Sequence, residues 1–380
     1  MKKINPLVAL TGAALALPAI AADQPTSAKL SFLSSTYHEK DIKNSTILSG
    51  AGKRYDIEKN QFRLVTPLGE NWSGDLYVSQ EAMSGASPWG TFHGADDESS
   101  LIMSGATIRD KRTQVNLSGR KYNEDSSYGF TLTRSKEDDY SARGFGVSGE
   151  WDLNNKLSTV SAGFSFSDDE IKPVDALKFG RIEKGKKQTR SFAAGWTQII
   201  NQNSILFTGI SHTMKQGLLS DPYKLRDTRP SKKAEWTLSF KYRQYFENRN
   251  AALHADYRLY NDDFGVTSHT AGIAWKKSIG DKLKIAPRFR YYSQSEADFY
   301  AFGDNYSLAK TEAQSSDHRL SGFGSTTTGV QISYELGKWS MKMSFDKYSS
   351  KNSLGHAESE KEHPALLDFT LWSAGFDLEI

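Results

Sequence analysis

The sequence has no cysteine in its 380 residues, and it has few features of an enzyme or a nucleic-acid-binding protein. Without cysteine the chain forms no disulfide, no thiolate metal site and no c-type haem attachment. No phosphate-binding glycine-rich loop, zinc motif or dinucleotide fingerprint occurs, so we expect no cofactor. The 48 basic residues nearly balance the 45 acidic ones, which argues against a nucleic-acid partner.

Long hydrophobic segments are also scarce, which argues against a helical membrane protein. One apolar run, residues 7–20, follows Lys2 and Lys3 and ends at small residues around Ala21. A basic start, a short apolar run and a small-x-small site are typical of a secretory signal peptide. We therefore predict that residues 1–21 are removed by cleavage before Ala22 and that residues 22–380 form one outer-membrane β-barrel domain.

The carboxyl terminus carries the pattern of a membrane-spanning β-strand, with an apolar face opposite a mostly polar one. The apolar face contains Trp372, Ala374, Phe376, Leu378 and Ile380. The end of this strand also resembles the signal that the bacterial barrel-assembly machinery reads, in the residues Gly375, Phe376, Leu378 and Ile380. That signal usually ends in an aromatic residue, and Ile380 departs from it. The alternative is an edge strand of a soluble sheet.

Period-two alternation recurs along the chain and predicts about sixteen strands, within a range of about 14 to 18. Seven of the eight tryptophans, all but Trp89, fall on the apolar faces. Short polar turns alternate with long polar segments, which are residues 38–53, 84–106, 168–188, 211–232, 293–321 and 349–363. We therefore predict an all-β, antiparallel transmembrane barrel in the bacterial outer membrane. It has short periplasmic turns, long extracellular loops and both termini in the periplasm.

Five internal segments resemble those of a known family, and they follow one another along most of the chain. They are residues 84–88, 255–260, 261–270, 290–300 and 317–324. Together they resemble an uncharacterised bacterial family, the domain of unknown function 3570. The resemblance implies an outer-membrane barrel and brings no established activity. Relatives tend to be encoded near small lipoproteins and periplasmic redox or flavin-transferring proteins, so the resemblance also implies periplasmic or lipoprotein partners.

Polar residues on the expected inner faces gather on four successive strands, and we call them the basic ladder. Its members are Lys241, Arg243, His254, Asp256, Arg258, Tyr260, Arg288, Arg290 and Tyr292. Side chains at one level of neighbouring strands interact across the wall. In one interpretation the ladder lines a pore and guides anionic solutes through an aqueous channel. In the other, Asp256 and tyrosine hydroxyls satisfy the arginines in a structural network, and both interpretations can hold together.

Four acidic runs fall in or beside the expected loops, at residues 96–98, 137–139, 168–170 and 262–263. Oxygen-rich clusters suit Ca²⁺, but none of these runs has the spacing of a dedicated calcium loop. We therefore expect solvated loops that face the lipopolysaccharide layer, and no metal site. The segment Ser84–Pro88, followed by Trp89 and Gly90, predicts either an inward constriction or an ordered external turn.

These observations favour porin-like passage of small polar or anionic solutes. The alternative is a non-conducting scaffold or docking barrel for a periplasmic redox, flavin-transfer or envelope-maturation system. A second alternative is a hydrolase at the outer rim, because Ser268 and His269, with Asp262 and Asp263 nearby, supply the residue types of a general-base site. Adjacent strand residues point to opposite faces, so we assign no catalytic residue and expect no enzyme. The other expected partners are the lipid bilayer, lipopolysaccharide and the barrel-assembly machinery.

Overall fold

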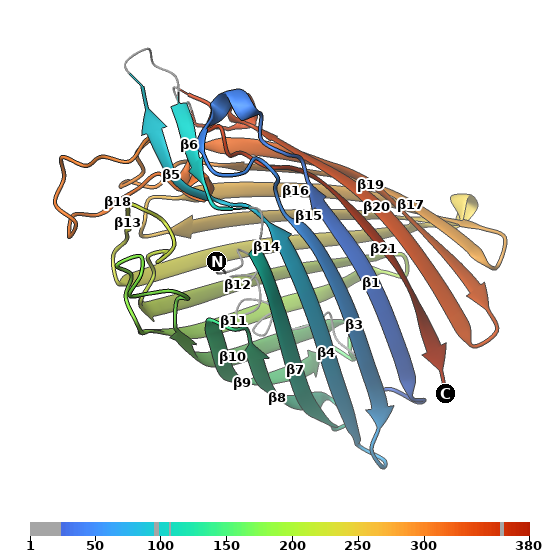
Figure 1. Ribbon diagram of the computed structural model, residues 1–380. Helices are drawn as coiled ribbons and strands as arrows, with labels where there is room; N and C mark the ends of the chain where they lie inside the picture. Colours follow the sequence, from blue (N-terminus) through green and yellow to red (C-terminus); the bar gives the residue numbers. More distant parts are fainter. Residues whose placement is uncertain (1–23, 95–98, 106–107, 358–360) are drawn as a thin grey trace.

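Sixteen antiparallel strands close into one barrel in the computed structural model (Figure 1). The structure describes residues 24–94, 99–105, 108–357 and 361–380. The predicted signal peptide, residues 1–21 with cleavage before Ala22, and the acidic run 96–98 lie outside the described residues. Among the residues described, no helix is long and apolar enough to cross a bilayer. The predicted fold class and the predicted number of strands are confirmed.

The barrel strands are 11 to 17 residues long, and each pairs with two neighbours. The first eight are β1 (Lys29–Glu39), β3 (Asp56–Pro67), β4 (Trp72–Gly85), β7 (Ile108–Tyr122), β8 (Ser126–Lys136), β9 (Tyr140–Leu153), β10 (Ser158–Ile171) and β11 (Gly185–Asn201). The other eight are β12 (Ser204–Gly217), β14 (Lys232–Phe246), β15 (Ala251–Asp262), β16 (Thr267–Ile279), β17 (Leu283–Gln294), β19 (Phe323–Leu336), β20 (Trp339–Lys351) and β21 (Asp368–Glu379).

The outer face of the barrel is an apolar band, as the alternation predicts. Phe32 pairs in register with Phe62 on one side and with Phe376 on the other, and alternate residues along each strand continue this face. Six tryptophans on this face are exposed, namely Trp72, Trp151, Trp196, Trp236, Trp339 and Trp372. Exposed apolar side chains around the whole wall suit a lipid environment, whereas a soluble protein would bury them.

The barrel closes where β21 pairs with β1, from Lys29 opposite Glu379 to Glu39 opposite Phe369. The carboxyl-terminal segment is therefore the closing strand. Gly375 is packed so closely there that a Cβ would lie 2.2 Å from the Phe32 carbonyl oxygen. On the inner face Asp377 accepts a hydrogen bond from Lys342 and contacts Lys29 Nζ at 3.2 Å. The seam thus combines close backbone packing with a charged contact inside the barrel.

The two ends of the barrel differ, as the lengths of the connections predict. At the end that holds the C-terminus, turns are short, and Gly280 and Gly337 adopt φ of +59° in two of them. A short 3-10 helix, η2 (Glu247–Arg249), forms another of these turns. At the opposite end, which we call the outer end, the strands run further than predicted. Residues 168–171 and 185–188 pair in β10 and β11, and residues 211–217 belong to β12.

The outer connections pack against each other, and we call them the outer cap. The cap contains a sheet of β2 (Ile47–Ser49), β6 (Ser99–Met103) and β5 (Pro88–His93), a sheet of β13 (Asp227–Thr228) and β18 (Gln314–Ser315), and the 3-10 helices η1 (Asn44–Thr46), η3 (His318–Leu320) and η4 (Asn352–Leu354). Ala86 and Leu101 are fully buried in its apolar core. The Ser84–Pro88 segment is an ordered part of this cap, because Ser87 and Ser104 exchange hydrogen bonds.

Candidate functional site

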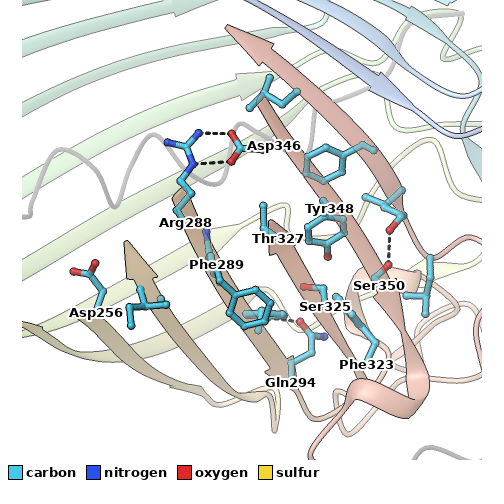
Figure 2. Close-up of a pocket in the computed structure, with 18 of the residues that line it drawn as sticks. Asp256, Arg288, Phe289, Gln294, Phe323, Ser325, Thr327, Asp346, Tyr348 and Ser350 are labelled. Atoms are coloured by element: carbon cyan, nitrogen blue, oxygen red, sulfur yellow. Dashed lines mark hydrogen bonds and ion pairs between the residues drawn. The ribbon is translucent and has the colours of Figure 1, made fainter. Parts of the chain in front are cut away.

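A cavity of about 690 Å³ lies inside the barrel, between the inner faces of β15 to β21 and the outer cap. Asp256, Arg288 and Arg290 line its wall, and His318, Arg319 and Leu366 come from the cap. The cavity is therefore built jointly by membrane strands and by loops that are distant in sequence. Figure 2 shows Arg288 and Asp346 joined across its wall, with Tyr348 and Ser350 on the same strand as Asp346.

The structure places the whole basic ladder on the inner side of the wall. Lys241 pairs with Asp256 and Arg243 with His254, whereas the alternate residues Phe240 and Tyr257 are exposed on the outer face. Four ladder residues line the cavity, and these are Asp256, Arg288, Arg290 and Tyr292. The other five are not among its lining residues: Lys241, Arg243, His254, Arg258 and Tyr260. Their role as pore-lining groups stays a prediction.

Part of the basic ladder forms a structural network of ion pairs, which was the second interpretation of the sequence. Arg288 holds Asp346 of β20 through Nε at 2.7 Å and Nη2 at 2.5 Å, as the dashed lines in Figure 2 mark. Arg243 Nη2 holds Asp256 at 2.7 Å. Two parallel bonds to one carboxylate fix the guanidinium in place. Sequence reasoning missed Asp346, because its partner is 58 residues away and two strands away in the ring.

Arg258 and Arg290 differ from the other arginines on the barrel's inner face. In the part of the chain that the structure describes, neither has a carboxylate within 4.0 Å. Inward-facing arginines that do have one are Arg63, Arg112, Arg120, Arg243 and Arg288. Both side chains belong to exposed residues, and their charges are close enough to interact. The barrel interior therefore carries two positive charges that the protein does not neutralise locally.

The strand between these two arginines has small inner residues. Arg258 pairs in register with Thr270 of β16, and Arg290 pairs with Gly272 of the same strand. A Cβ added at Gly272 would meet nothing closer than 3.9 Å. Two long side chains thus flank a shallow strip of wall, and this geometry leaves room for a small group beside both guanidinium ions.

Aromatic and hydroxyl side chains complete the cavity. Tyr348 stacks on Phe369 with ring centroids 4.5 Å apart, and Tyr292 lies against Phe323 at 5.8 Å. The Tyr292 hydroxyl donates to Gln294 Oε1 at 2.6 Å. A few polar groups in an otherwise apolar and aromatic lining are typical of sites for small molecules.

The charged groups of the outer cap above the cavity are largely paired with one another. Arg319 donates to the buried Asp317 carboxylate, which also accepts from Arg229 Nη2 at 2.8 Å. Burial lowers the pKa of His318, and burial together with the Lys224 charge lowers the pKa of His363 to about 3. His363 Nε2 lies 3.2 Å from Thr91 Oγ1 and 3.0 Å from the Ser316 carbonyl oxygen. Both histidines are therefore neutral near pH 7, and His363 links β5 to the segment before η3.

The residues considered for a rim hydrolase do not come together. Ser268 is 2% exposed on the inner side, and His269, the next residue, contacts the hydroxyl of the outward-facing Tyr257 through Nδ1 at 2.7 Å. Asp262 accepts from the backbone N–H groups of Phe264 and Val266, both at 3.0 Å, and so holds the β15–β16 turn. The geometry gives each of these residues a structural contact and does not form a Ser–His dyad.

The expectation that the acidic runs are solvated is wrong for several of their residues. Asp169 is buried in β10 and contacts Lys187 Nζ at 3.0 Å, and Asp262, Glu137 and Asp139 are at most 5% exposed. The physical reason is that the strands continue beyond the apolar band. Alternate acidic residues there turn inward, against neighbouring strands and the outer cap. Sequence spacing alone did not distinguish a loop from a strand at this end.

Comparison with known proteins identifies the family. The profile described as "Protein of unknown function (DUF3570)" matches residues 7–366. This chain belongs to the DUF3570 family. No curated protein matches this DUF3570 chain. The family assignment confirms the resemblance found in the sequence and supplies no activity.

Solved structures show how the DUF3570 barrel relates to known folds. A bacterial polysaccharide outer membrane secretin shares 9% identity, with a TM-score of 0.52 over 94% of this chain and 100% of the secretin. The siderophore receptor PirA from Pseudomonas aeruginosa shares 11% identity, with a TM-score of 0.47 over 93% of this chain and 62% of the receptor. A BenF-like porin from Pseudomonas fluorescens Pf-5 shares 7% identity, with a TM-score of 0.45 over 93% and 98%. The DUF3570 chain thus has the fold of an outer-membrane β-barrel, and it spans less than two thirds of the receptor's length.

Proposed function

We propose that this DUF3570 barrel lies in the bacterial outer membrane and passes small anionic solutes through its interior. The observation that carries the proposal is the pair Arg258 and Arg290, two inner arginines without a carboxylate within 4.0 Å in the described part of the chain. Arg290 lines the cavity of about 690 Å³, and Arg258 lies two strands away on the same inner face. Both termini lie in the periplasm in this proposal, because short turns are typical of the periplasmic end of such barrels. The outer cap then faces the medium.

The physical argument is that unpaired guanidinium groups select anions. A planar guanidinium binds carboxylate or phosphate through two parallel hydrogen bonds, and it stays charged at every physiological pH. Inside a cleft with low-dielectric walls, an excess of one sign of charge raises the local concentration of the opposite ion. The cavity volume of about 690 Å³ lies within the range of small-molecule sites, which is roughly 300–1,000 Å³.

Single-channel recording of the purified barrel in planar bilayers tests this proposal. We expect measurable current, and we expect inorganic phosphate to reduce it as phosphate occupies the arginine pair. In Arg258→Gln/Arg290→Gln the phosphate block should weaken at least tenfold. The matched control is Arg63→Gln/Lys284→Gln, which removes two exposed inner charges that are paired with Asp75 and Glu335.

Two outcomes would overturn the proposal. One is the absence of current under every condition, which would favour the docking scaffold instead. The other is a phosphate block that is equally strong in the arginine variant and in the wild type. A block that weakens equally in the control variant would show that total charge matters and the arginine pair does not.

A further inference from the structure

The cavity wall contains two neighbouring rows of inner side chains, and each row includes an arginine of β17. In the first row Arg288 pairs in register with Gly329, and Gly329 pairs with Asp346 of β20. Arg288 reaches across this glycine and donates two hydrogen bonds to the Asp346 carboxylate. An arginine on this wall is therefore able to bind a carboxylate that lies two strands away.

The second row has an aromatic ring where the first row has a carboxylate. Arg290 pairs with Thr327, and Thr327 pairs with Tyr348. Tyr348 therefore occupies the position that Asp346 has in the first row, and Figure 2 shows Thr327 and Tyr348 on adjacent strands. The Arg290 charge is close enough to interact with the hydroxyls of Tyr292 and Tyr348. An anion bound to Arg290 on this side therefore lies beside a ring.

The acid on the other side of Arg290 is held by a different arginine. Asp256 lies in the same row across Gly272, and its carboxylate accepts a hydrogen bond from Arg243 Nη2 at 2.7 Å. The charges of Arg258 and Arg290 interact with each other. Two positive charges close together favour an anionic ligand between or beside them.

The second row continues into a flat aromatic surface, formed by Tyr348 and Phe369, which we call the ring surface. Tyr348 pairs in register with Phe369 of β21, and the two rings stack with centroids 4.5 Å apart and an angle of 12° between their planes. The Tyr37 ring of β1 extends this surface, with its centroid 4.6 Å from that of Phe369. Tyr348 and Phe369 both line the cavity. A flat ligand is able to cover this apolar area and remove it from water.

We propose that the cavity binds aromatic carboxylates, with the carboxylate on Arg290 and the aromatic ring against the ring surface. This inference rests on the proposed function, since it names the class of anion that the arginines admit. A guanidinium binds a carboxylate through two parallel hydrogen bonds, and aromatic rings favour offset or edge-to-face contacts. Neighbouring strands lie about 4.8 Å apart, so Arg290 and Tyr348 leave their strands about 10 Å from each other. The long arginine side chain shortens that gap to one that a carboxylate joined directly to a ring bridges.

Calorimetric titration of the refolded wild-type barrel in detergent tests the inference with benzoate, acetate and cyclohexanecarboxylate. All three ligands carry one carboxylate, and only benzoate carries a flat aromatic ring. We expect benzoate to bind at least tenfold more tightly than acetate and at least threefold more tightly than cyclohexanecarboxylate. Equal affinities of benzoate and either of the other two ligands would overturn the inference, and so would the absence of benzoate binding.

A pair of variants locates the ring-binding part of the cavity. Tyr348→Leu/Phe369→Leu keeps apolar side chains and removes both flat rings, so the ratio of benzoate to acetate affinity should fall at least threefold. The matched control is Tyr77→Leu on β4, because Tyr77 is absent from the cavity lining and its hydroxyl donates to Gln61 Oε1 at 2.8 Å. The control should keep the wild-type ratio. An unchanged ratio in a folded Tyr348→Leu/Phe369→Leu barrel would contradict the assignment, and the three-ligand comparison in the wild type decides if this variant does not fold.

The binding measurement needs no current, so it separates this inference from solute passage. Benzoate selectivity in a barrel that carries no current would support the aromatic carboxylate site and remove the proposed passage. A phosphate-sensitive current, together with equal affinities for benzoate and acetate, would support passage and overturn the aromatic specificity.

Discussion

The interior of this barrel pairs its arginines with carboxylates in one region and leaves two arginines without a carboxylate in another. Arg258 of β15 and Arg290 of β17 have no carboxylate within 4.0 Å among the described residues, whereas Arg112 and Arg120 of β7, almost opposite in the ring of strands, contact Glu137 and Glu150. In the region of Arg258 and Arg290, the latter lines the cavity, whereas in the other region Arg112, Glu137 and Glu150 are buried. The difference indicates that the buried ion pairs hold the wall together, and it supports the proposal that the exposed arginines without a carboxylate serve a passing anion.

The strongest way to test this contrast is to unpair an arginine that the protein pairs. Asp346→Asn leaves Arg288 without its carboxylate, and we expect unfolding to become easier by about 3 kcal/mol. Arg290→Gln leaves no carboxylate without its partner, so its effect on the free energy of unfolding should stay within about 0.5 kcal/mol. Chemical denaturation of the refolded barrels measures both values.

The double variant Arg288→Gln/Asp346→Asn is the control for the pair. It removes both charges, so it should be more stable than Asp346→Asn alone. If Arg290→Gln destabilises the barrel as strongly as Asp346→Asn, then Arg290 has a structural partner and the contrast fails.

A weaker effect should appear in the outer cap, which covers the cavity. Burial lowers the pKa of His363 to about 3. Below pH 6.5, His363 therefore takes up a proton in the unfolded cap but stays neutral in the folded cap. The stability that the neutral His363 gives to the folded cap is therefore complete above pH 6.5. It falls with decreasing pH, by about 2 kcal/mol at pH 5. Proteolysis of the outer loops should accelerate at pH 5 relative to pH 7.5, while the barrel strands stay protected.

The variant His363→Gln sharpens the acid experiment. Gln retains a polar group near Thr91 and the Ser316 carbonyl, and it does not titrate. The variant should reduce the acid sensitivity, although His318 beside it titrates in the same sense. Cleavage at equal rates at both pH values in the wild type would contradict the buried, neutral state of His363.

The smallest effect concerns the seam at which the barrel closes. Gly375→Ala places a methyl group 2.2 Å from the Phe32 carbonyl oxygen, so the backbone must shift, at a cost of about 1 kcal/mol. Gly272→Ala is the matched control, because its methyl group meets no atom closer than 3.9 Å. The unfolding temperature should fall in the first variant and not in the second. Equal temperatures would mean that Gly375 matters for assembly signalling and not for packing.

Alternation along the sequence was sufficient to predict the barrel wall and the inner placement of His254 and Arg258. A period of two is a local property, so each strand reports its own two faces. The contacts of the site are not local. Arg288 meets Asp346 across 58 residues, and Thr91 meets His363 across 272. Asp169 and Asp262 looked like loop acids because nothing in their spacing reveals that the strands extend past the apolar band.

The most direct test of the central claim is the reversal potential of the wild-type barrel in a KCl gradient across a planar bilayer. The unpaired arginines predict a potential of the sign given by preferential chloride flow, and a shift toward zero in Arg258→Gln/Arg290→Gln. A reversal potential that indicates cation preference, or one that the double variant leaves unchanged, would contradict the assignment of these two arginines to anion passage.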